Sequence, residues 1–125
     1  MTLKSFRVVY AEDDALVRAG VAQMLVEHGV AVHECANGDE AARLCSVFRP
    51  DAVLLDLSMP EVDGCEAARR IREQGLPARL VALTGRGEDA LEAAARAGFD
   101  EFVRKPGSVA TILSALRCPE EPAGT

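Results

Sequence analysis

The chain has 125 residues, of which 49% are hydrophobic, and a formal net charge of −6. A single domain of this length can bury a full core without disulfides or metal ions. The negative charge argues against direct binding to nucleic acid. No apolar stretch approaches the roughly 20 residues that cross a bilayer, and Met1–Phe6 lacks the apolar segment of a secretory leader. We therefore expect a soluble, cytoplasmic protein.

The composition also predicts the fold class and the state of the thiols. With four Phe, one Tyr and no Trp, the core must be built from aliphatic residues, which favours buried parallel strands. The cysteines show no C-x-x-C spacing, so we expect reduced thiols that pack in the structure. A structural zinc ion would need closely spaced pairs of Cys or His, which the sequence lacks. The four positions are Cys35, Cys45, Cys65 and Cys118.

The predicted elements alternate from the beginning of the chain. The apolar run Phe6–Ala11 predicts a strand, and the helical spacing of apolar residues over Asp14–His28 predicts a helix. Gly29 ends that helix, because glycine readily takes the positive φ of a helix terminus. The next run, Val30–Ala36, mixes polar residues into its apolar positions, which indicates a strand at the edge of a sheet.

The middle of the chain contains the strongest predicted strand. Asn37 is a predicted N-cap for a helix that runs to about Phe48. Ala52–Leu55 is an uninterrupted aliphatic strand, and Asp56 follows it directly. A loop rich in turn residues then leads into a predicted helix over Cys65–Gln74.

The last third of the chain repeats the alternation twice. Arg79–Leu83 predicts a fourth strand, and the segment between Gly87 and Gly98 predicts a fourth helix. Glu101–Arg104 predicts the fifth strand. Ser108 is a predicted N-cap for the last helix, whose apolar face includes Ile112, Leu113 and Leu116.

Five strands that alternate with five helices predict an α/β fold, a doubly wound parallel sheet covered on both faces. The predicted domain covers residues 1–118. The polar, proline-interrupted tail over residues 119–125 is expected to be disordered. In such sheets the ligand site lies beyond the carboxyl ends of the strands.

Polar side chains follow four of the predicted strands at that edge. Glu12 and Asp13 follow the first, Asp56 the third, Thr84 the fourth and Lys105 the fifth. Single polar residues at loop tips are usually only solvated, but four strand ends meet at one edge of a parallel sheet. Neighbouring carboxylates repel one another, and a Mg²⁺ ion, which prefers oxygen ligands, relieves that repulsion. A metal ion and a lysine together neutralise charge in phosphoryl transfer, and a carboxylate is a competent nucleophile.

The order and spacing of several motifs resemble those of the response-regulator receiver family, the CheY-like domains of two-component signalling. The resemblance extends to about Leu116. The matching pieces are Glu12-Asp13, Val53-Leu54-Leu55-Asp56-Leu57-Ser58-Met59-Pro60, Asp63-Gly64, Val81-Ala82-Leu83-Thr84-Gly85 and Phe102-Val103-Arg104-Lys105-Pro106.

The resemblance implies a set of site residues. Asp56 is the implied phosphoacceptor. Glu12, Asp13 and Asp56 are implied Mg²⁺ ligands, together with the backbone carbonyl of Ser58, and Lys105 is the implied phosphate contact. Glu12 replaces the commoner Asp of the family.

The resemblance also implies a switch, partners and a sheet order of 2-1-3-4-5. Thr84 is the implied switch hydroxyl and Phe102 the implied switch aromatic, where Phe replaces the usual Tyr, so the switch must act by packing. The Lys105–Pro106 bond is a candidate cis peptide. A histidine kinase or a histidine phosphotransfer protein is the implied donor, with a downstream protein or output domain as target. A homodimer through helix 4, strand 5 and helix 5 is a further possibility.

On this interpretation the chain is a signalling switch that catalyses only its own phosphorylation and dephosphorylation. Two alternatives stay open at the level of the sequence. One is a pseudo-receiver, a binding module that has the fold but is not usefully phosphorylated. The other is a metal-dependent phosphatase, although Ser58 stands where that class usually has a second acid.

Overall fold

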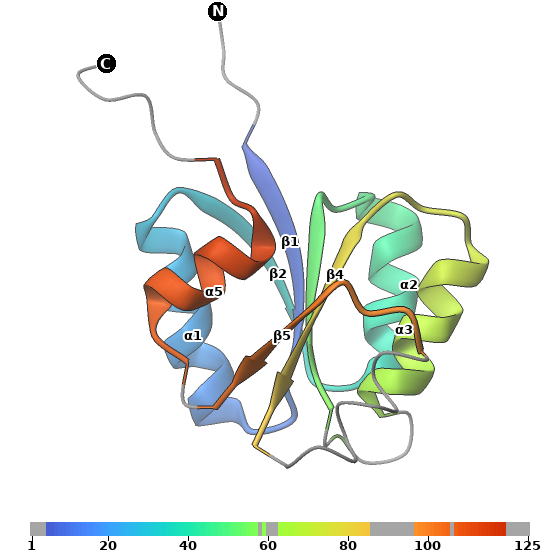
Figure 1. The fold of residues 1–125 in the computed structure, drawn as a ribbon, viewed down its shortest axis with the longest axis horizontal. Coiled ribbons are helices and arrows are strands. Elements are labelled where there is room, and N and C mark those ends of the chain that lie inside the picture. The colour runs from blue at the N-terminus through green and yellow to red at the C-terminus, as the bar shows by residue number, and fades with distance from the viewer. Residues whose placement is uncertain (1–4, 58, 60–62, 86–96, 106, 120–125) are drawn as a thin grey trace, which may run out of the picture.

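The computed structural model describes residues 5–57, 59, 63–85, 97–105 and 107–119. The described part forms a central sheet with a helical layer on each side (Figure 1). The strands are β1 (Phe6–Ala11), β2 (Val30–Cys35), β3 (Ala52–Asp56), β4 (Arg79–Thr84) and β5 (Glu101–Arg104). The helices in this part are α1 (Ala15–Glu27), α2 (Gly38–Phe48), α3 (Gly64–Glu73) and α5 (Val109–Leu116).

All strand pairs are parallel, and the sheet order is β2-β1-β3-β4-β5. The predicted doubly wound sheet and its order are therefore confirmed, and β2 lies at an edge as its mixed polarity indicated. The helix expected between Gly87 and Gly98 falls on residues outside the described part, apart from Ala97. The described residues thus carry four of the five expected helices.

Each face of the sheet has its own hydrophobic core. Side chains alternate between the faces along each strand, so neighbours such as Leu54 and Leu55 belong to different cores. One core packs against α1 and α5 and contains Tyr10 and Leu54. The other packs against α2 and α3 and contains Ala11 and Leu55 (Figure 1). Every residue of β3 is buried, which explains its uninterrupted aliphatic sequence.

The helices begin at polar N-cap residues, as their sequences predicted. The side chains of Asn37 and Ser108 accept hydrogen bonds from backbone N–H groups in the first turns of α2 and α5. Asp14 caps α1 in the same way, so it precedes that helix and does not form its first residue. Gly29, directly after the C-cap of α1, has a φ of 85°, which confirms its predicted role.

Arg72 of α3 stabilises the end of the sheet opposite the carboxyl ends of the strands. Its guanidinium donates to the backbone carbonyls of Ala78 (2.8 Å) and Gly98 (2.8 and 3.1 Å) and to Oδ2 of Asp100 (2.7 Å). The same Asp100 oxygen accepts the backbone N–H of Leu80 at 2.8 Å. One side chain therefore joins α3 to the segments that precede β4 and β5.

The four cysteines are free, in agreement with the predicted packing thiols. Cys35 and Cys45 are buried, and burial raises the pKa of each thiol to about 12. Thiols protonated to this extent are weak nucleophiles and weak metal ligands.

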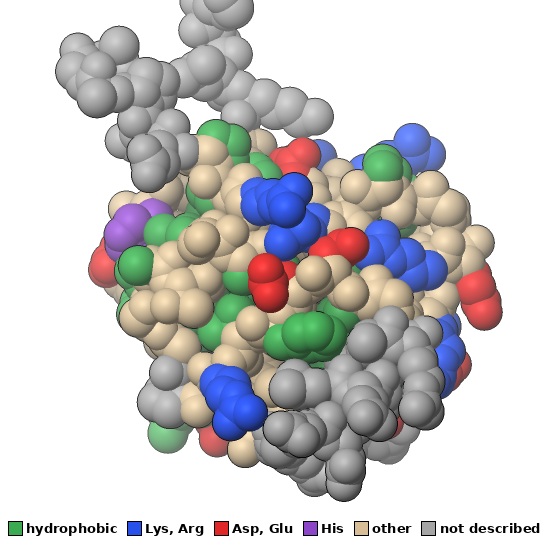
Figure 2. All heavy atoms as spheres, in the orientation of Figure 1, with side chains coloured by type: hydrophobic (Ala, Val, Ile, Leu, Met, Phe, Trp, Pro, Cys, Tyr) green, Lys and Arg blue, Asp and Glu red, His purple; other side chains and the backbone are tan. Residues whose placement is uncertain are grey.

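The surface around β5 mixes both signs of charge. Figure 2 shows acidic and basic side chains interspersed on this face, where Arg79 lies 3.7 Å from Glu101 and Arg72 pairs with Asp100. The described side chains on this face therefore form no continuous basic patch. None of the described helices is long and apolar enough to cross a membrane.

Candidate functional site

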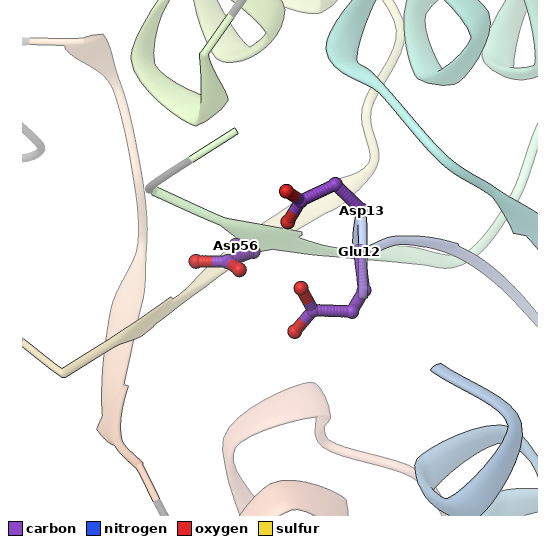
Figure 3. Close-up of side chains that lie close together, drawn as sticks. All are labelled: Glu12, Asp13 and Asp56. Carbon is purple, nitrogen blue, oxygen red and sulfur yellow. The ribbon is translucent and has the colours of Figure 1, made fainter. Parts of the chain in front are cut away.

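Three carboxylates meet at the carboxyl ends of β1 and β3. The register pairs Ala11 with Leu55, so Glu12, the next residue after β1, stands beside Asp56 at the end of β3. Glu12 and Asp56 are only 1% and 3% exposed, whereas Asp13 is exposed. One oxygen from each of the three lies within 4.8 Å of the others, and Figure 3 shows the three carboxylates gathered around a common space.

Lys105 lies against two of these carboxylates. Its Nζ atom donates hydrogen bonds of 2.8 Å to Oε1 of Glu12 and to Oδ2 of Asp56. Its backbone N–H donates to the carbonyl of Thr84 at 2.9 Å, which ties the end of β5 to the end of β4. Partial burial lowers the pKa of Lys105, but the hydrogen bonds to Asp56 and Glu12 outweigh that effect and hold the pKa above its usual value.

The site contains more negative than positive charge. Burial, and then the neighbouring Asp56 carboxyl, raises the pKa of Glu12, and the Lys105 ammonium opposes this shift only in part. Among the residues that the structure describes, three carboxylates face one ammonium at this edge of the sheet. The donors are all oxygens, and two ligands on opposite sides of a Mg²⁺ ion lie about 4.2 Å apart. Since the three oxygens already lie within 4.8 Å of one another, the residues fit a hard divalent cation.

Gly64, the first residue of α3, lies against the backbone of Asp56. A Cβ atom at position 64 would lie 2.5 Å from the backbone oxygen of Asp56 and 3.0 Å from Cα of Leu57. Contacts this short with backbone atoms cannot be relieved by a side-chain rotation. The first residue of α3 must therefore be glycine for the helix to approach the strand end this closely.

The predicted switch residues lie on neighbouring strands. Thr84 ends β4 and is 1% exposed, and Phe102 of β5 is half-buried. Phe102 is the register partner of Ala82, two residues before Thr84, so Phe102 and Thr84 project from the same face of the sheet. Phe102 packs against the core that also contains Ala82. The predicted roles of Ser58 and of the Lys105–Pro106 bond concern positions 58 and 106, which lie outside the described residues.

Tyr10 lies directly behind the acidic residues on β1. Its ring is completely buried, and its phenolic oxygen has no hydrogen-bond partner among the residues that the structure describes. Burial, followed by the negative charges of Glu12 and Asp56, raises the pKa of the phenol well above its usual value. The phenol is therefore neutral at any ordinary pH.

Sequence reasoning found the acidic residues and Lys105 but missed two supporting residues. The carbonyl of Glu12 accepts a hydrogen bond of 2.7 Å from Arg18 of α1, and Gly64 makes the close approach to Asp56. The Asp63-Gly64 pair was visible as a turn signal. Nothing in the spacing of Arg18 pointed to Glu12, because the contact depends on how the first turns of α1 fold back over the strand.

A five-stranded 2-1-3-4-5 sheet with acidic residues, a hydroxyl and a lysine at its carboxyl edge defines a CheY-like α/β domain. The family model for the response regulator receiver domain matches residues 8–117. The chain belongs to this family, which confirms the resemblance seen in the sequence. Receiver domains are signalling modules of two-component systems, and they interact with kinases and output domains.

Similar proteins include the transcriptional regulatory protein PdtaR of Mycobacterium tuberculosis, 38% identical over 112 residues, which cover 88% of this chain and 54% of PdtaR. The response regulator MprA of Mycolicibacterium vanbaalenii is 33% identical over 125 residues, which cover 94% of this chain and 54% of MprA. The chain thus spans about half the length of these relatives.

Solved structures show the same fold. The signal receiver domain of NarL from Mycobacterium tuberculosis superposes with a TM-score of 0.84 at 30% identity, with 92% of this chain and 95% of that chain covered. The receiver domain of the sensor histidine kinase PA1611 from Pseudomonas aeruginosa gives a TM-score of 0.85 at 28% identity, with 91% and 96% covered. That structure has a magnesium ion coordinated in its active-site cleft.

Proposed function

We propose that the chain accepts a phosphoryl group on Asp56 in a Mg²⁺-dependent reaction and thereby acts as a switch in two-component signalling or a phosphorelay. The observation that carries this proposal is the convergence of the Glu12, Asp13 and Asp56 oxygens within 4.8 Å, with the Lys105 ammonium 2.8 Å from Asp56. A buried carboxylate beside a second cation-binding carboxylate and an ammonium has the chemistry of a phosphoryl acceptor.

In the proposed reaction a carboxylate oxygen of Asp56 attacks phosphorus, the new P–O bond forms, and the P–N bond of a donor phosphohistidine breaks. The electron pair of that bond stays on the imidazole, which takes a proton on leaving. Glu12, Asp13, Asp56 and the backbone carbonyl of Ser58 would hold the Mg²⁺ ion, which supplies positive charge next to the transferring group. Lys105 would contact a phosphoryl oxygen from its place beside Asp56.

The switch would run through Thr84 and Phe102. The Thr84 hydroxyl would donate a hydrogen bond to a phosphoryl oxygen, and Phe102, half-buried on the same face of the sheet, would repack in response. The phosphoryl group signals only if it binds one of two packed states more tightly than the other. Since Phe102 has no hydroxyl, its part in the switch would depend on packing alone.

The donor would be a histidine kinase or a histidine phosphotransfer protein. We propose that it binds in an apolar groove beside the site. The groove, about 400 Å³ in volume, lies between α1 and α5, with Val17, Met24 and Ile112 among its lining residues. Lys105 lines the same groove and also contacts Asp56, so a protein seated there reaches the phosphoacceptor. Leu16, also in the lining, is 86% exposed, so its side chain is accessible to a protein seated in the groove.

Other parts of the proposal concern the output. The target would be a downstream protein or an output domain, and a homodimer would use β5, α5 and the helix expected between Gly87 and Gly98. That helix falls outside the described residues, so sedimentation of the phosphorylated and unphosphorylated chain is the direct measurement of self-association. No direct contact with nucleic acid is proposed for this acidic domain, and a cytoplasmic location stays a prediction.

The test is the intact mass of the protein after incubation with acetyl phosphate and Mg²⁺. The wild type should gain about 80 Da, the mass of one phosphoryl group, and lose it on alkaline treatment. Asp56→Asn should gain nothing, whereas the control Asp51→Asn, which removes an exposed acid at the opposite edge of the sheet, should react like the wild type. A wild type without adduct even after rapid quenching would favour the pseudo-receiver interpretation instead.

A further inference from the structure

Arg18, on the second turn of α1, reaches back to the acidic end of β1. Its Nη1 atom donates a hydrogen bond of 2.7 Å to the backbone carbonyl of Glu12. Its Nε atom lies 3.7 Å from Oε1 of Glu34, and the Arg18 side chain is only 23% exposed. A single guanidinium on α1 therefore contacts both the end of β1 and the neighbouring strand β2.

Glu12 is held at each of its polar atoms. Its N–H donates to the carbonyl of Cys35 at 3.1 Å, Oε1 accepts from Lys105 at 2.8 Å, and Oε2 accepts from the N–H of Asp14 at 3.2 Å. The carbonyl that Arg18 holds is different in kind, because it belongs to the peptide unit that joins Glu12 to Asp13. A hydrogen bond to this oxygen fixes the plane of that peptide, and hence the direction in which Asp13 leaves the strand.

Asp13 depends on its backbone for this direction. Its carboxylate is exposed, and the described residues provide it with no hydrogen bond or ion pair. Figure 3 nevertheless shows its side chain turned toward the space shared with Glu12 and Asp56. We infer that Arg18 is a positioning residue for the metal site: by holding the Glu12–Asp13 peptide it keeps the Asp13 carboxylate within reach of the ion.

This inference rests on the proposed function, because it assigns a role in the Mg²⁺ site of that proposal. For the loss of Arg18, it predicts a change in Mg²⁺ affinity opposite in direction to the change that charge alone would cause. Removing a nearby positive charge should by itself tighten Mg²⁺ binding by a few-fold at most, since less positive charge repels the ion. Removing a hydrogen bond that orients a ligand should weaken binding by about tenfold or more.

The experiment is a calorimetric Mg²⁺ titration of the unphosphorylated protein, with the variants Arg18→Met, Arg18→Lys and Glu34→Gln. We expect the dissociation constant to rise about tenfold in Arg18→Met and to recover in part in Arg18→Lys, which retains a donor. Glu34→Gln should stay within about twofold of the wild type, because it leaves the bond to the Glu12 carbonyl intact.

Arg79→Met is the matched control. Arg79 is also poorly exposed, at 18%, and its Nε atom also donates to a backbone carbonyl, that of Ala115 at 2.6 Å, but far from the acidic residues. Its loss removes the same charge and should leave Mg²⁺ affinity within about twofold of the wild type. Thermal unfolding of each variant shows which of them are folded.

An Arg18→Met protein that is folded and binds Mg²⁺ as tightly as Arg79→Met, or more tightly, would overturn the inference. Should Arg18→Met not fold, Arg18→Gln carries the same test: weaker binding than Arg79→Met supports the positioning role, and equal binding overturns it. A wild type that binds no Mg²⁺ would count against the proposed function itself. This outcome differs from a failure of the positioning role alone, in which the wild type and Arg18→Met bind Mg²⁺ equally well.

Discussion

The ammonium of Lys105 lies 2.8 Å from Oδ2 of Asp56, although 49 residues separate the two in the chain. Asp56 is buried, whereas the side chain of Lys105 is 32% exposed and lines the groove between α1 and α5. Lys105 can therefore move away from the carboxylate without disturbing the core. In the proposed reaction it would pass from an Asp56 oxygen to an oxygen of the incoming phosphoryl group.

Replacing Lys105 with Met should slow phosphorylation of Asp56 by acetyl phosphate about 100-fold, because the reaction loses a donor to the developing negative charge. The measurement is the initial rate of adduct formation by mass spectrometry. Arg104→Met is the control, since Arg104 is the preceding residue and is exposed. A Lys105→Met protein that reacts at the wild-type rate would rule out this role.

Replacing Asp56 with Asn should stabilise the protein in Mg²⁺-free buffer. In water the two neighbouring carboxylates, about 5 Å away, each repel the Asp56 charge by about 1 kcal/mol, and the Lys105 ammonium attracts it by about 1.5 kcal/mol. Because the introduced amide keeps an oxygen that can accept from Lys105, the net gain should be about 0.5 kcal/mol, a rise in Tm of about 2 °C for a domain of this size. Thermal unfolding followed by circular dichroism measures the change. Asp51→Ala should instead lower the Tm, because it removes the carboxylate that accepts the backbone N–H of Arg7; a drop in both variants would argue against repulsion in the site.

Two glycine-to-alanine changes should have opposite effects. Gly64→Ala should cost about 2 kcal/mol and slow phosphorylation, because the new Cβ would press on the backbone of Asp56. Gly20→Ala, inside α1 with nothing within 4 Å of its new Cβ, should stabilise the protein by about 0.5–1 kcal/mol. Urea unfolding measures both, and equal effects would refute the steric argument.

Asp100 should make the stability of the fold sensitive to acid. Burial tends to raise the pKa of this carboxyl, but the Leu80 N–H and the Arg72 guanidinium outweigh burial and hold the pKa below its usual value. A carboxyl with a lowered pKa stabilises the folded state above its unfolded pKa of about 3.9, and this contribution is lost as the pH falls through the folded pKa.

Asp100→Asn should therefore be less stable than the wild type at pH 7 by about 1 kcal/mol, a value reduced by the partial exposure of the site. The difference should begin to shrink below about pH 4, where the carboxyl of the unfolded chain takes up its proton, and it is lost as the pH falls through the lower pKa of the folded carboxyl. Urea unfolding at pH 7 and pH 3 checks this prediction. A difference that is the same at both pH values would mean that the charge of Asp100 does not contribute.

The groove beside Lys105 can be tested with a protein donor. Leu16→Asp should lower the rate of phosphotransfer from the cognate histidine kinase or phosphotransfer protein by about tenfold, because an apolar contact is lost from the interface. The rate with acetyl phosphate should not change. Val47→Asp, on α2 and 72% exposed, is the matched control. Equal loss in both variants would show that the groove is not the docking surface.

The sequence was sufficient to predict the sheet and most of the described site. Glu12, Asp56 and Lys105 follow aliphatic runs, and parallel strands bring their carboxyl ends to one edge, so their proximity follows from topology. The 2-1-3-4-5 order itself came from the resemblance. The predicted limits of the strands and helices differ from the observed ones by a residue or two, as at Asp14, which caps α1.

Other features could not be predicted because they depend on close packing between segments. The contact from Arg18 to the Glu12 carbonyl depends on the turn between β1 and α1, which has no periodic signal. The need for glycine at position 64 depends on how near α3 lies to β3. The Arg72 contacts to Ala78 and Gly98 join three segments that the alternating pattern leaves independent.

The buried phenol of Tyr10 provides this protein with its own optical probe. The chain contains one tyrosine and no tryptophan, so fluorescence excited at wavelengths that its four phenylalanines do not absorb comes from this single ring. The ring lies behind Glu12 and Asp56, and its raised pKa keeps the ground-state phenol protonated across ordinary buffers. We therefore expect emission from the unlabelled wild type to report the proposed cation binding and acylphosphate formation in real time, without a dye and without an engineered tryptophan.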